Sequence, residues 1–165
     1  MSFKNRFIPT CLLGFVLGVL FFVPGTASEP HNNPSVAAGV TFFYYEDLAK
    51  AADWYENKLG LKKVTDEGWV VIFEWTESSH LGLVNATEGT LKPTTDKGAM
   101  YSIDTADLED WYERLKNVEG ISIPQGIQES SNGMIEVFSI TDPGGYIVEF
   151  FRWRDHRPEA EKYGH

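Results

Sequence analysis

Few side chains in this sequence are suited to chemistry, and the most suggestive is a single carboxylate. Glu149 lies in an aromatic, apolar segment. Its neighbours at two-residue spacing are Ile147, Phe151 and Trp153, which share its side of an extended strand. A carboxylate in apolar surroundings holds its proton more strongly unless it is paired, so Glu149 is a candidate catalytic residue, as a general base or acid. The alternative is that it only hydrogen-bonds a ligand or a neighbouring side chain.

Histidine and cysteine offer less. His80 is the one imidazole near segments expected to form strands, whereas His31, His156 and His165 fall in expected tails or beyond the last strand. Cys11 is the only cysteine, which excludes a disulfide framework and a cysteine-based zinc site.

The elements that position these residues come in two similar halves. The tetrapeptide Asp-Trp-Tyr-Glu occurs at residues 53–56 and again at 110–113, each time within an amphipathic helical pattern. Gly60 and Gly120 are plausible helix stops, and Asp47 and either Asp104 or Thr105 are plausible N-caps. Strands are expected at 40–45, 61–65, 69–75 and 81–85, then at 99–103, 121–129 with a break at Pro124, 134–140 and 146–153. Each half is therefore β-α-β-β-β, which predicts an α+β fold.

Two motifs of the chain resemble the vicinal oxygen chelate (VOC) superfamily of glyoxalases, bleomycin-resistance proteins and extradiol dioxygenases. They are Phe42-Phe43-Tyr44-Tyr45-x-Asp47-Leu48 with Trp54-Tyr55 and Leu59-Gly60-Leu61, and Thr141-Asp142-Pro143-Gly144-Gly145-Tyr146 with Glu149-Phe150. The resemblance implies two βαβββ modules that form a curled mixed sheet around a cleft, commonly in a homodimer. We expect a flexible lead-in over 28–36, a VOC domain over 37–153 and a polar tail over 154–165. Within the domain, module 1 spans 37–86, the linker 87–97 and module 2 98–153.

Metal-dependent members of this superfamily hold a divalent ion with side chains from four strands. Carried over by position, those ligands fall on Val40, near Leu83, on Gly98 or Ala99, and on Glu149, so only one position keeps a donor. One carboxylate cannot hold a catalytic metal, and we expect no metal and no other cofactor. A divalent metal held by Glu149 and His80 is the disfavoured alternative. If Leu83 faces the cleft, alternation places His80 on the opposite face or at a turn.

The resemblance also suggests which residues line the cleft. Strand alternation points six of them inward as candidate ligand-binding residues: Phe42, Tyr44, Leu83, Met100, Ser102 and Phe151. An aromatic, mostly apolar cavity with one or two carboxylates suits a flat or amphipathic small molecule, with a cationic one as an option. The alternative is that many of these side chains simply fill the core.

The N-terminus resembles a secretory signal peptide. Lys4 and Arg6 precede a short apolar run, and small residues end at Ala27, so we expect residues 1–27 to be removed and the protein to be periplasmic or secreted. An uncleaved anchor is the alternative. The net charge of the 165-residue chain is −10, and removal of Lys4 and Arg6 leaves 12 basic against 24 acidic residues. Such a charge argues against nucleic acid or an anionic membrane surface as a partner.

These observations favour an exported protein of the VOC type that binds a small, aromatic or amphipathic molecule without the usual metal, as a homodimer. An alternative is an enzyme, a glyoxalase-type lyase or isomerase that uses Glu149 as a base or a relocated metal site. A third possibility is a structural or adaptor protein whose cleft is filled by side chains.

Overall fold

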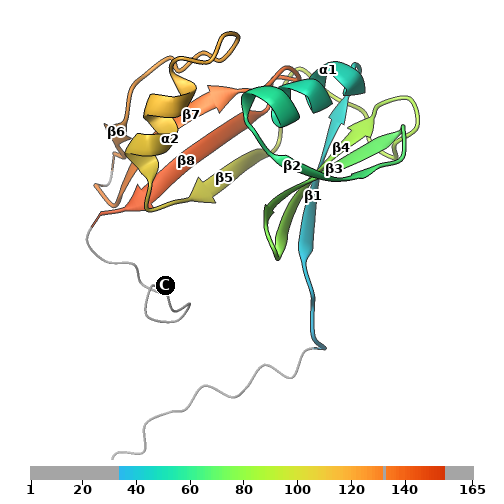
Figure 1. Cartoon of the computed structure of the whole chain (residues 1–165), viewed down its shortest axis with the longest axis horizontal. Coiled ribbons are helices and arrows are strands. Elements are labelled where there is room, and N and C mark those ends of the chain that lie inside the picture. Colours follow the sequence, from blue (N-terminus) through green and yellow to red (C-terminus); the bar gives the residue numbers. More distant parts are fainter. Residues whose placement is uncertain (1–33, 132, 155–165) are drawn as a thin grey trace, which may run out of the picture. The chain divides into compact units, whose positions relative to one another are not determined.

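The computed structural model describes residues 34–131 and 133–154, which fold into two sheets with one helical segment each (Figure 1). The first module contains β1 (Gly39–Tyr45), α1 (Leu48–Asp53), the π-helical turn η1 (Trp54–Lys58), β2 (Lys62–Asp66), β3 (Val70–Thr76) and β4 (Ser79–Asn85). The second contains β5 (Met100–Asp104), α2 (Leu108–Leu115), β6 (Gln128–Glu129), β7 (Ile135–Thr141) and β8 (Ile147–Trp153). The predicted α+β fold with two βαβββ modules is confirmed.

Both sheets have the same mixed topology. Their strand orders are β1-β4-β3-β2 and β5-β8-β7-β6, and in each the first pair is parallel while the others are antiparallel. The strand expected over 121–129 is wrong for most of its length, because only Gln128 and Glu129 pair with β7. Pro124 lacks a backbone N–H and Gly126 adds no packing side chain, so neither residue supports a ladder there.

The helices begin and end differently in the two modules. Asp47 caps α1 as expected, since its carboxylate accepts a hydrogen bond from the Lys50 N–H at 2.9 Å. The N-cap of α2 is Asp107, not Asp104 or Thr105, and the Thr105 hydroxyl instead accepts from the Asp107 N–H at 3.1 Å. In η1 the Leu59 N–H bonds to the Trp54 carbonyl at 3.0 Å, five residues back, which widens the turn.

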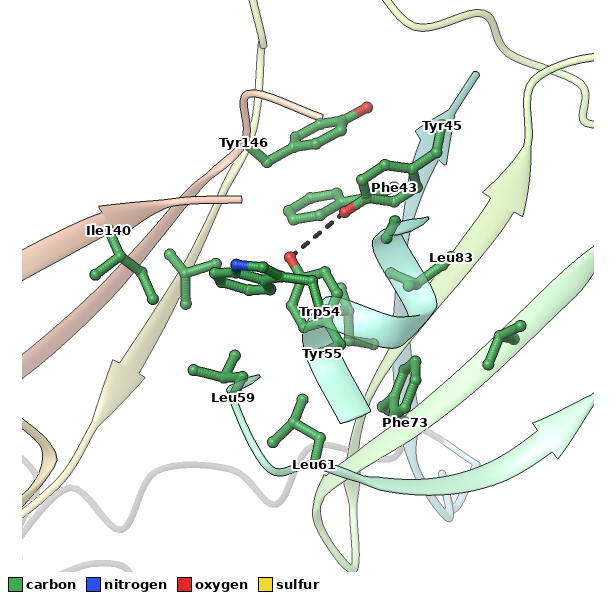
Figure 2. Packing of buried hydrophobic residues seen from close by; sticks show 14 of the residues in the cluster. Phe43, Tyr45, Trp54, Tyr55, Leu59, Leu61, Phe73, Leu83, Ile140 and Tyr146 are labelled. Carbon is green, nitrogen blue, oxygen red and sulfur yellow. Dashed lines mark hydrogen bonds between the residues drawn. The ribbon is translucent and has the colours of Figure 1, made fainter. Parts of the chain in front are cut away.

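The core lies on the helix side of both sheets and runs from one module into the other (Figure 2). Phe43 stacks on Tyr146 with ring centroids 4.0 Å apart, and Trp75 stacks on Tyr101 at 5.6 Å. Each pair joins a residue of the first module to one of the second. Such aromatic pairs add stabilisation beyond the apolar area that they bury.

Asp142 is the one charged side chain buried within the described residues, with 5% of its surface exposed. Its carboxylate accepts hydrogen bonds from the hydroxyls of Tyr45 and Tyr55, the latter at 2.8 Å. It also accepts from the backbone N–H groups of Gly144 and Tyr146, at 2.9 and 2.8 Å. This network gives the Asp-Pro-Gly-Gly segment a structural role, because it ties the first module to the turn before β8.

The two tyrosines of this network resist ionisation. Burial is the main cause that raises the pKa of Tyr45, and the charges of Tyr55 and Asp142 add to it. Burial likewise raises the pKa of Tyr55 well above its usual value, with Asp142 as the next cause. Both hydroxyls therefore stay protonated and serve as hydrogen-bond donors to the carboxylate.

The helix ends are completed across the module boundary. Lys58, at the end of η1, donates from Nζ to the Glu119 carbonyl beyond α2 at 2.5 Å. Arg114, near the end of α2, donates from Nη2 to the Lys58 and Leu59 carbonyls at 3.3 and 3.0 Å. Arg114 thus supplies a cation to the carbonyls at the end of η1, and Lys58 supplies one to the turn after α2.

The expected signal peptide at 1–27, most of the lead-in and all but the first residue of the C-terminal tail lie outside the described residues. Within the described part of the chain, no helix combines the length and the apolar character needed to cross a bilayer.

Candidate functional site

Each sheet has one face against the helices and one face without a helix, which we call the open face. The two faces are distinguished by burial along the strands: Phe43 and Tyr45 of β1 are buried, whereas Phe42 between them is 46% exposed. On β8, Val148 and Phe150 are buried and Glu149 is not. Register then places five further residues on open faces with Glu149: Phe42, Tyr44, Met100, Ser102 and Phe151.

Leu83 does not lie there. It pairs with Phe43, is fully buried and belongs to the core under the helix, so its predicted inward orientation is wrong (Figure 2). The error is a shift of one residue, which turns every side chain of a strand to the other face. The same shift affects His80, which lies within β4 on the open face and is not an exposed turn histidine.

The two modules place very different residues at equivalent positions. Phe42 pairs with Gly82 between β1 and β4, and Ser102 pairs with Glu149 between β5 and β8. Asp47-Leu48 and Asp107-Leu108 follow these strands at the same distance, so Phe42 corresponds to Ser102 and Gly82 to Glu149. The Phe42 ring lies over Gly82, where a Cβ atom would come within 2.3 Å of it.

Glu149 sits in a small pocket of the second sheet. Its Oε1 accepts a hydrogen bond from the Ser102 hydroxyl at 2.5 Å, and Ser139 is its cross-strand neighbour on β7. The pocket has a volume of about 270 Å³ and is closed by the segment 124–128. Its lining residues are Pro124, Gln125, Gly126, Gln128, Val137, Phe138, Ser139 and Glu149.

Three polar residues of this pocket were not predicted from sequence: Gln125, Gln128 and Ser139. Ser139 was recoverable in principle, since it stands opposite Glu149 once β7 and β8 are paired. Both glutamines fall in the strand expected over 121–129, of which only Gln128 and Glu129 pair with β7, so Gln125 carried no usable signal.

Apolar side chains flank the polar centre of this open face. Met100 pairs with Ile147 on one side, and these side chains are 45% and 44% exposed. On the other side Phe151 pairs with Val137 and packs edge to face against Trp153, with centroids 5.9 Å apart. The face therefore presents the Glu149 carboxylate between two apolar strips, with Asp104 of β5 beside Phe151.

The open face of the first sheet carries its polar groups at one end. His80 lies between Val40 and Glu74, and Glu74 forms an ion pair with Lys62 at 2.9 Å. The Nδ1 atom of His80 is buried and has no hydrogen-bond partner among the described residues. The centre of this face, at Phe42, Gly82 and Ile72, is apolar.

These residues do not fit a metal site of the expected kind. One of the four expected ligand positions lies near Leu83. The residue there that points to the open face is Gly82, and the Phe42 ring covers it. Val40 offers no donor, and Glu149 is bonded to a hydroxyl. Among residues 34–131 and 133–154, no group of three histidine, cysteine, aspartate or glutamate side chains is placed to hold a metal ion.

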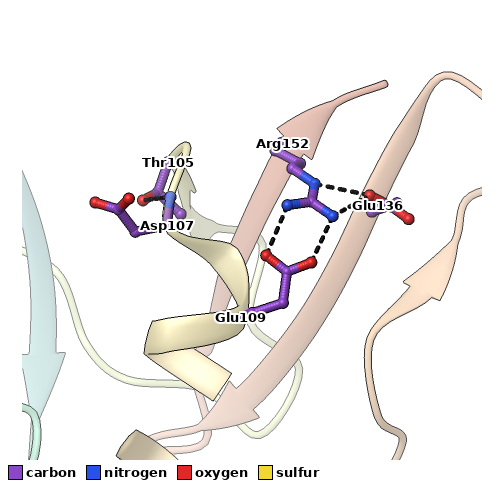
Figure 3. A network of polar contacts seen from close by, with 5 residues as sticks. All are labelled: Thr105, Asp107, Glu109, Glu136 and Arg152. Carbon is purple, nitrogen blue, oxygen red and sulfur yellow. Dashed lines mark hydrogen bonds and ion pairs between the residues drawn. The ribbon is translucent and has the colours of Figure 1, made fainter. Parts of the chain in front are cut away.

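The cations nearest to Glu149 in sequence are engaged elsewhere. Arg152 lies on the helix side of β8, where it binds Glu109 of α2 through both terminal nitrogens and Glu136 of β7 through Nε at 2.7 Å (Figure 3). These contacts raise the pKa of Arg152 and lower that of Glu109. Arg154 pairs with Glu129. Neither arginine faces Glu149, in agreement with the alternation of the strand.

A larger cavity, of about 360 Å³, lies where the two modules and the linker meet. It shares only Tyr44 with the predicted site, and its other lining residues are Tyr45, Glu46, Asp47, Lys50, Pro93, Thr94, Thr95, Lys97, Pro143 and Gly144. We place the site at the smaller pocket, because it joins the partly buried Glu149 carboxylate to the exposed apolar face.

Comparison with known proteins identifies the architecture. The sequence profile described as "Glyoxalase/Bleomycin resistance protein/Dioxygenase superfamily" matches residues 37–150. No curated protein sequence gives a significant match.

Among solved structures, a glyoxalase/bleomycin resistance protein/dioxygenase from Nocardioides has a TM-score of 0.60 and 16% identity, covering 76% of this chain and 87% of that one. Lactoylglutathione lyase from Agrobacterium tumefaciens has a TM-score of 0.56 and 22% identity, covering 79% and 98%. A superfamily member from Alicyclobacillus acidocaldarius has a TM-score of 0.58 and 20% identity, covering 75% and 96%. At these identities the likeness concerns the fold.

Proposed function

Because the chain belongs to the glyoxalase/bleomycin resistance protein/dioxygenase superfamily, we propose that it binds a small aromatic or amphipathic molecule without the usual metal. Domains of this superfamily bind small molecules. The observation that carries the proposal is Glu149, which is hydrogen-bonded to Ser102 and lines a pocket beside exposed apolar side chains. Apolar strips beside one polar group are the usual make-up of a small-molecule site.

The candidate contacts follow from the open faces. Met100 and Phe151 flank Glu149 on its own sheet, and Phe42 and Tyr44 offer an aromatic surface on the other. That the two open faces enclose one cleft, as the resemblance implies, is part of the proposal. The absence of a metal is supported by the replacement of ligand positions with Val40 and Gly82, which have no donor atoms.

A native mass spectrum of protein purified from its own source, without chelator, tests both parts. We expect a bound organic molecule and no stoichiometric metal in elemental analysis. Stoichiometric zinc, nickel, manganese or iron would contradict metal-independent binding. Repeated preparations with neither ligand nor affinity for aromatic compounds would favour a structural or adaptor role.

One observation favours a second candidate, a lyase or isomerase in which Glu149 is the base. Glu149 is partly buried, and one carboxylate oxygen is held by Ser102 while the other is free to accept a proton. In this case Glu149→Gln should abolish turnover without changing the fold or the thermal unfolding midpoint. Full activity in that variant would remove Glu149 from the chemistry.

We also propose a homodimer. It is supported by exposed apolar residues on both open faces, with Val40 42% and Ile147 44% exposed, because apolar patches of this kind usually mark an interface. Sedimentation equilibrium should give twice the chain mass. A monomer at micromolar concentration would contradict the proposal.

Export is proposed from residues 1–27 alone. Sequencing the N-terminus of the protein from its own source tests cleavage, which we expect after Ala27. An intact Met1 in the cell membrane fraction would instead indicate a retained anchor.

A further inference from the structure

The Glu149 carboxylate has a feature that the proposed function does not use. Seven ion pairs occur among the described residues, and Glu149 takes part in none of them. Its one hydrogen-bond donor there is the neutral Ser102 hydroxyl, which occupies Oε1. A partly buried charge of this kind normally gains a cation or several donors, since an unpaired carboxylate loses hydration without compensation.

The surroundings leave room for a counter-ion. The pocket beside Glu149 has a volume of about 270 Å³, room for roughly nine groups of the size of a water molecule, and it adds Ser139 and two glutamine side chains as further polar groups. The nearest arginines in sequence cannot fill it, because Arg152 is bound to Glu109 and Glu136 and Arg154 to Glu129. No lysine, arginine or histidine of the described residues forms an ion pair with Glu149, which leaves this carboxylate available to a cationic group of a ligand.

The apolar strips indicate the chemistry of the rest of the molecule that carries the cationic group. Met100 and Ile147 lie on one side of Glu149, and Phe151 and Val137 on the other, so a charged group at the carboxylate is followed directly by apolar contacts. The net charge of −10 favours the approach of cations over anions. Charge-assisted hydrogen bonds are roughly twice as strong as neutral ones.

From these observations we infer that the site selects organic cations: an ammonium or amidinium group at Glu149, carried on an aromatic or aliphatic body that covers the apolar strips. This inference rests on the proposed small-molecule binding and narrows it to one charge class. Anionic ligands are disfavoured by the same carboxylate.

Three probes with one ring system test the charge preference: 2-naphthylmethylammonium, 2-naphthylmethanol and 2-naphthoate. Isothermal titration at low salt should give the tightest binding for the ammonium, about tenfold tighter than the alcohol, with 2-naphthoate the weakest. The preference should shrink as salt is added. Binding of the ammonium no tighter than that of the alcohol, including no measurable binding of any probe, overturns the inference.

Substitutions of Glu149 test whether this side chain causes the preference for the ammonium probe. Glu149→Gln should lower ammonium affinity to within about twofold of the alcohol while alcohol affinity stays unchanged, and Glu149→Asp should keep part of the preference. Glu113→Gln is the matched control, since it removes the same charge from the exposed face of α2. A preference that survives in Glu149→Gln overturns the inference.

The failure of this inference is distinguishable from failure of the proposed function. Equal binding of the ammonium and the alcohol leaves small-molecule binding intact and removes only the charge selectivity. The native mass spectrum described above tests binding itself without any of the three probes.

Discussion

The two open faces share a backbone and differ in chemistry. At equivalent positions the first module has Phe42 over Gly82, and the second has Ser102 bonded to Glu149. The first module therefore offers an aromatic surface with no polar group at its centre, and the second offers a carboxylate. The repeated fold supplies two similar platforms, and single residues on each decide what the platform can bind.

The two copies of the tetrapeptide Asp-Trp-Tyr-Glu also differ between the modules, on the helix side of the sheets. Tyr55 is fully buried and its hydroxyl reaches Asp142 of the other module, whereas Tyr112 is partly buried and packs edge to face against Phe138 of its own module. The wider turn of η1 accompanies the burial of both Trp54 and Tyr55. The two tyrosines thus differ, since Tyr55 links the modules and Tyr112 packs locally, although Trp111 of the second copy also contacts Trp75 of the first module, with ring centroids 6.3 Å apart.

The largest expected change in the free energy of unfolding concerns the turns that precede β4 and β8. β3 ends at Thr76 and β7 at Thr141, so Glu77 and Asp142 occupy the same position. Asp142→Ala removes the acceptor of two hydroxyls and two N–H groups and should cost about 3–5 kcal/mol of unfolding free energy. Glu77→Ala, at an exposed site, should stay within about 0.5 kcal/mol. Urea denaturation measures both, and similar losses would break the distinction between the two turns.

The next largest loss of stability is expected at the two tyrosines of the repeated tetrapeptide, Tyr55 and Tyr112. Tyr55→Phe leaves a buried carboxylate with one donor fewer and should cost about 1–3 kcal/mol. Tyr112→Phe removes a hydroxyl from a partly buried ring and should cost less than about 0.5 kcal/mol. The same denaturation series decides the matter: equal costs would show that the two copies do not differ in role.

Alkaline pH should weaken the link between the modules. The pKa values of Tyr45 and Tyr55 are raised in the folded chain from 10.0, chiefly by burial. Their contribution is therefore complete below about pH 10 and is lost as pH rises above the unfolded pKa toward the folded one, because only the unfolded chain releases these protons. Stability should fall by about 1–2 kcal/mol between pH 10 and roughly pH 11. A Tyr45→Phe, Tyr55→Phe double variant should show a shallower decline, and an unchanged slope would contradict this assignment.

The smallest effect is expected where Phe42 covers Gly82. Gly82→Ala forces the exposed ring aside, because a Cβ atom would lie 2.3 Å from it, and should cost about 1 kcal/mol. In a Phe42→Ser background, which copies the second module, the same substitution should cost almost nothing. Thermal unfolding of the unchanged protein, the two single variants and the double variant measures the coupling between the two positions as a double-mutant cycle. Equal costs in both backgrounds would show that the ring does not restrict this position.

The sequence predicted the architecture because the relevant signals were local. Alternating aromatic residues, the Asp47 cap and the glycines after the helices report on their own segments. The side of the sheet to which each β4 side chain points could not be predicted from residues 79–85 alone. Leu81 and Leu83 are two residues apart and share a face, and only the pairing with β1 shows that this is the buried face. Gln125 was missed for a related reason, since its loop position depends on packing that periodicity does not encode. Gln128 lies in the short strand β6, and its place in the pocket depends on the pairing of β6 with β7.

The exchanged cations at the helix ends bear on how the chain folds. Carbonyls at the end of η1 are satisfied by Arg114, and the Glu119 carbonyl in the turn after α2 by Lys58, so these contacts form only when the modules have docked. Contacts this far apart in sequence form late and raise the contact order. We therefore expect one cooperative unfolding transition for both modules. A fragment of residues 37–86 alone should show rapid amide hydrogen exchange throughout its helix.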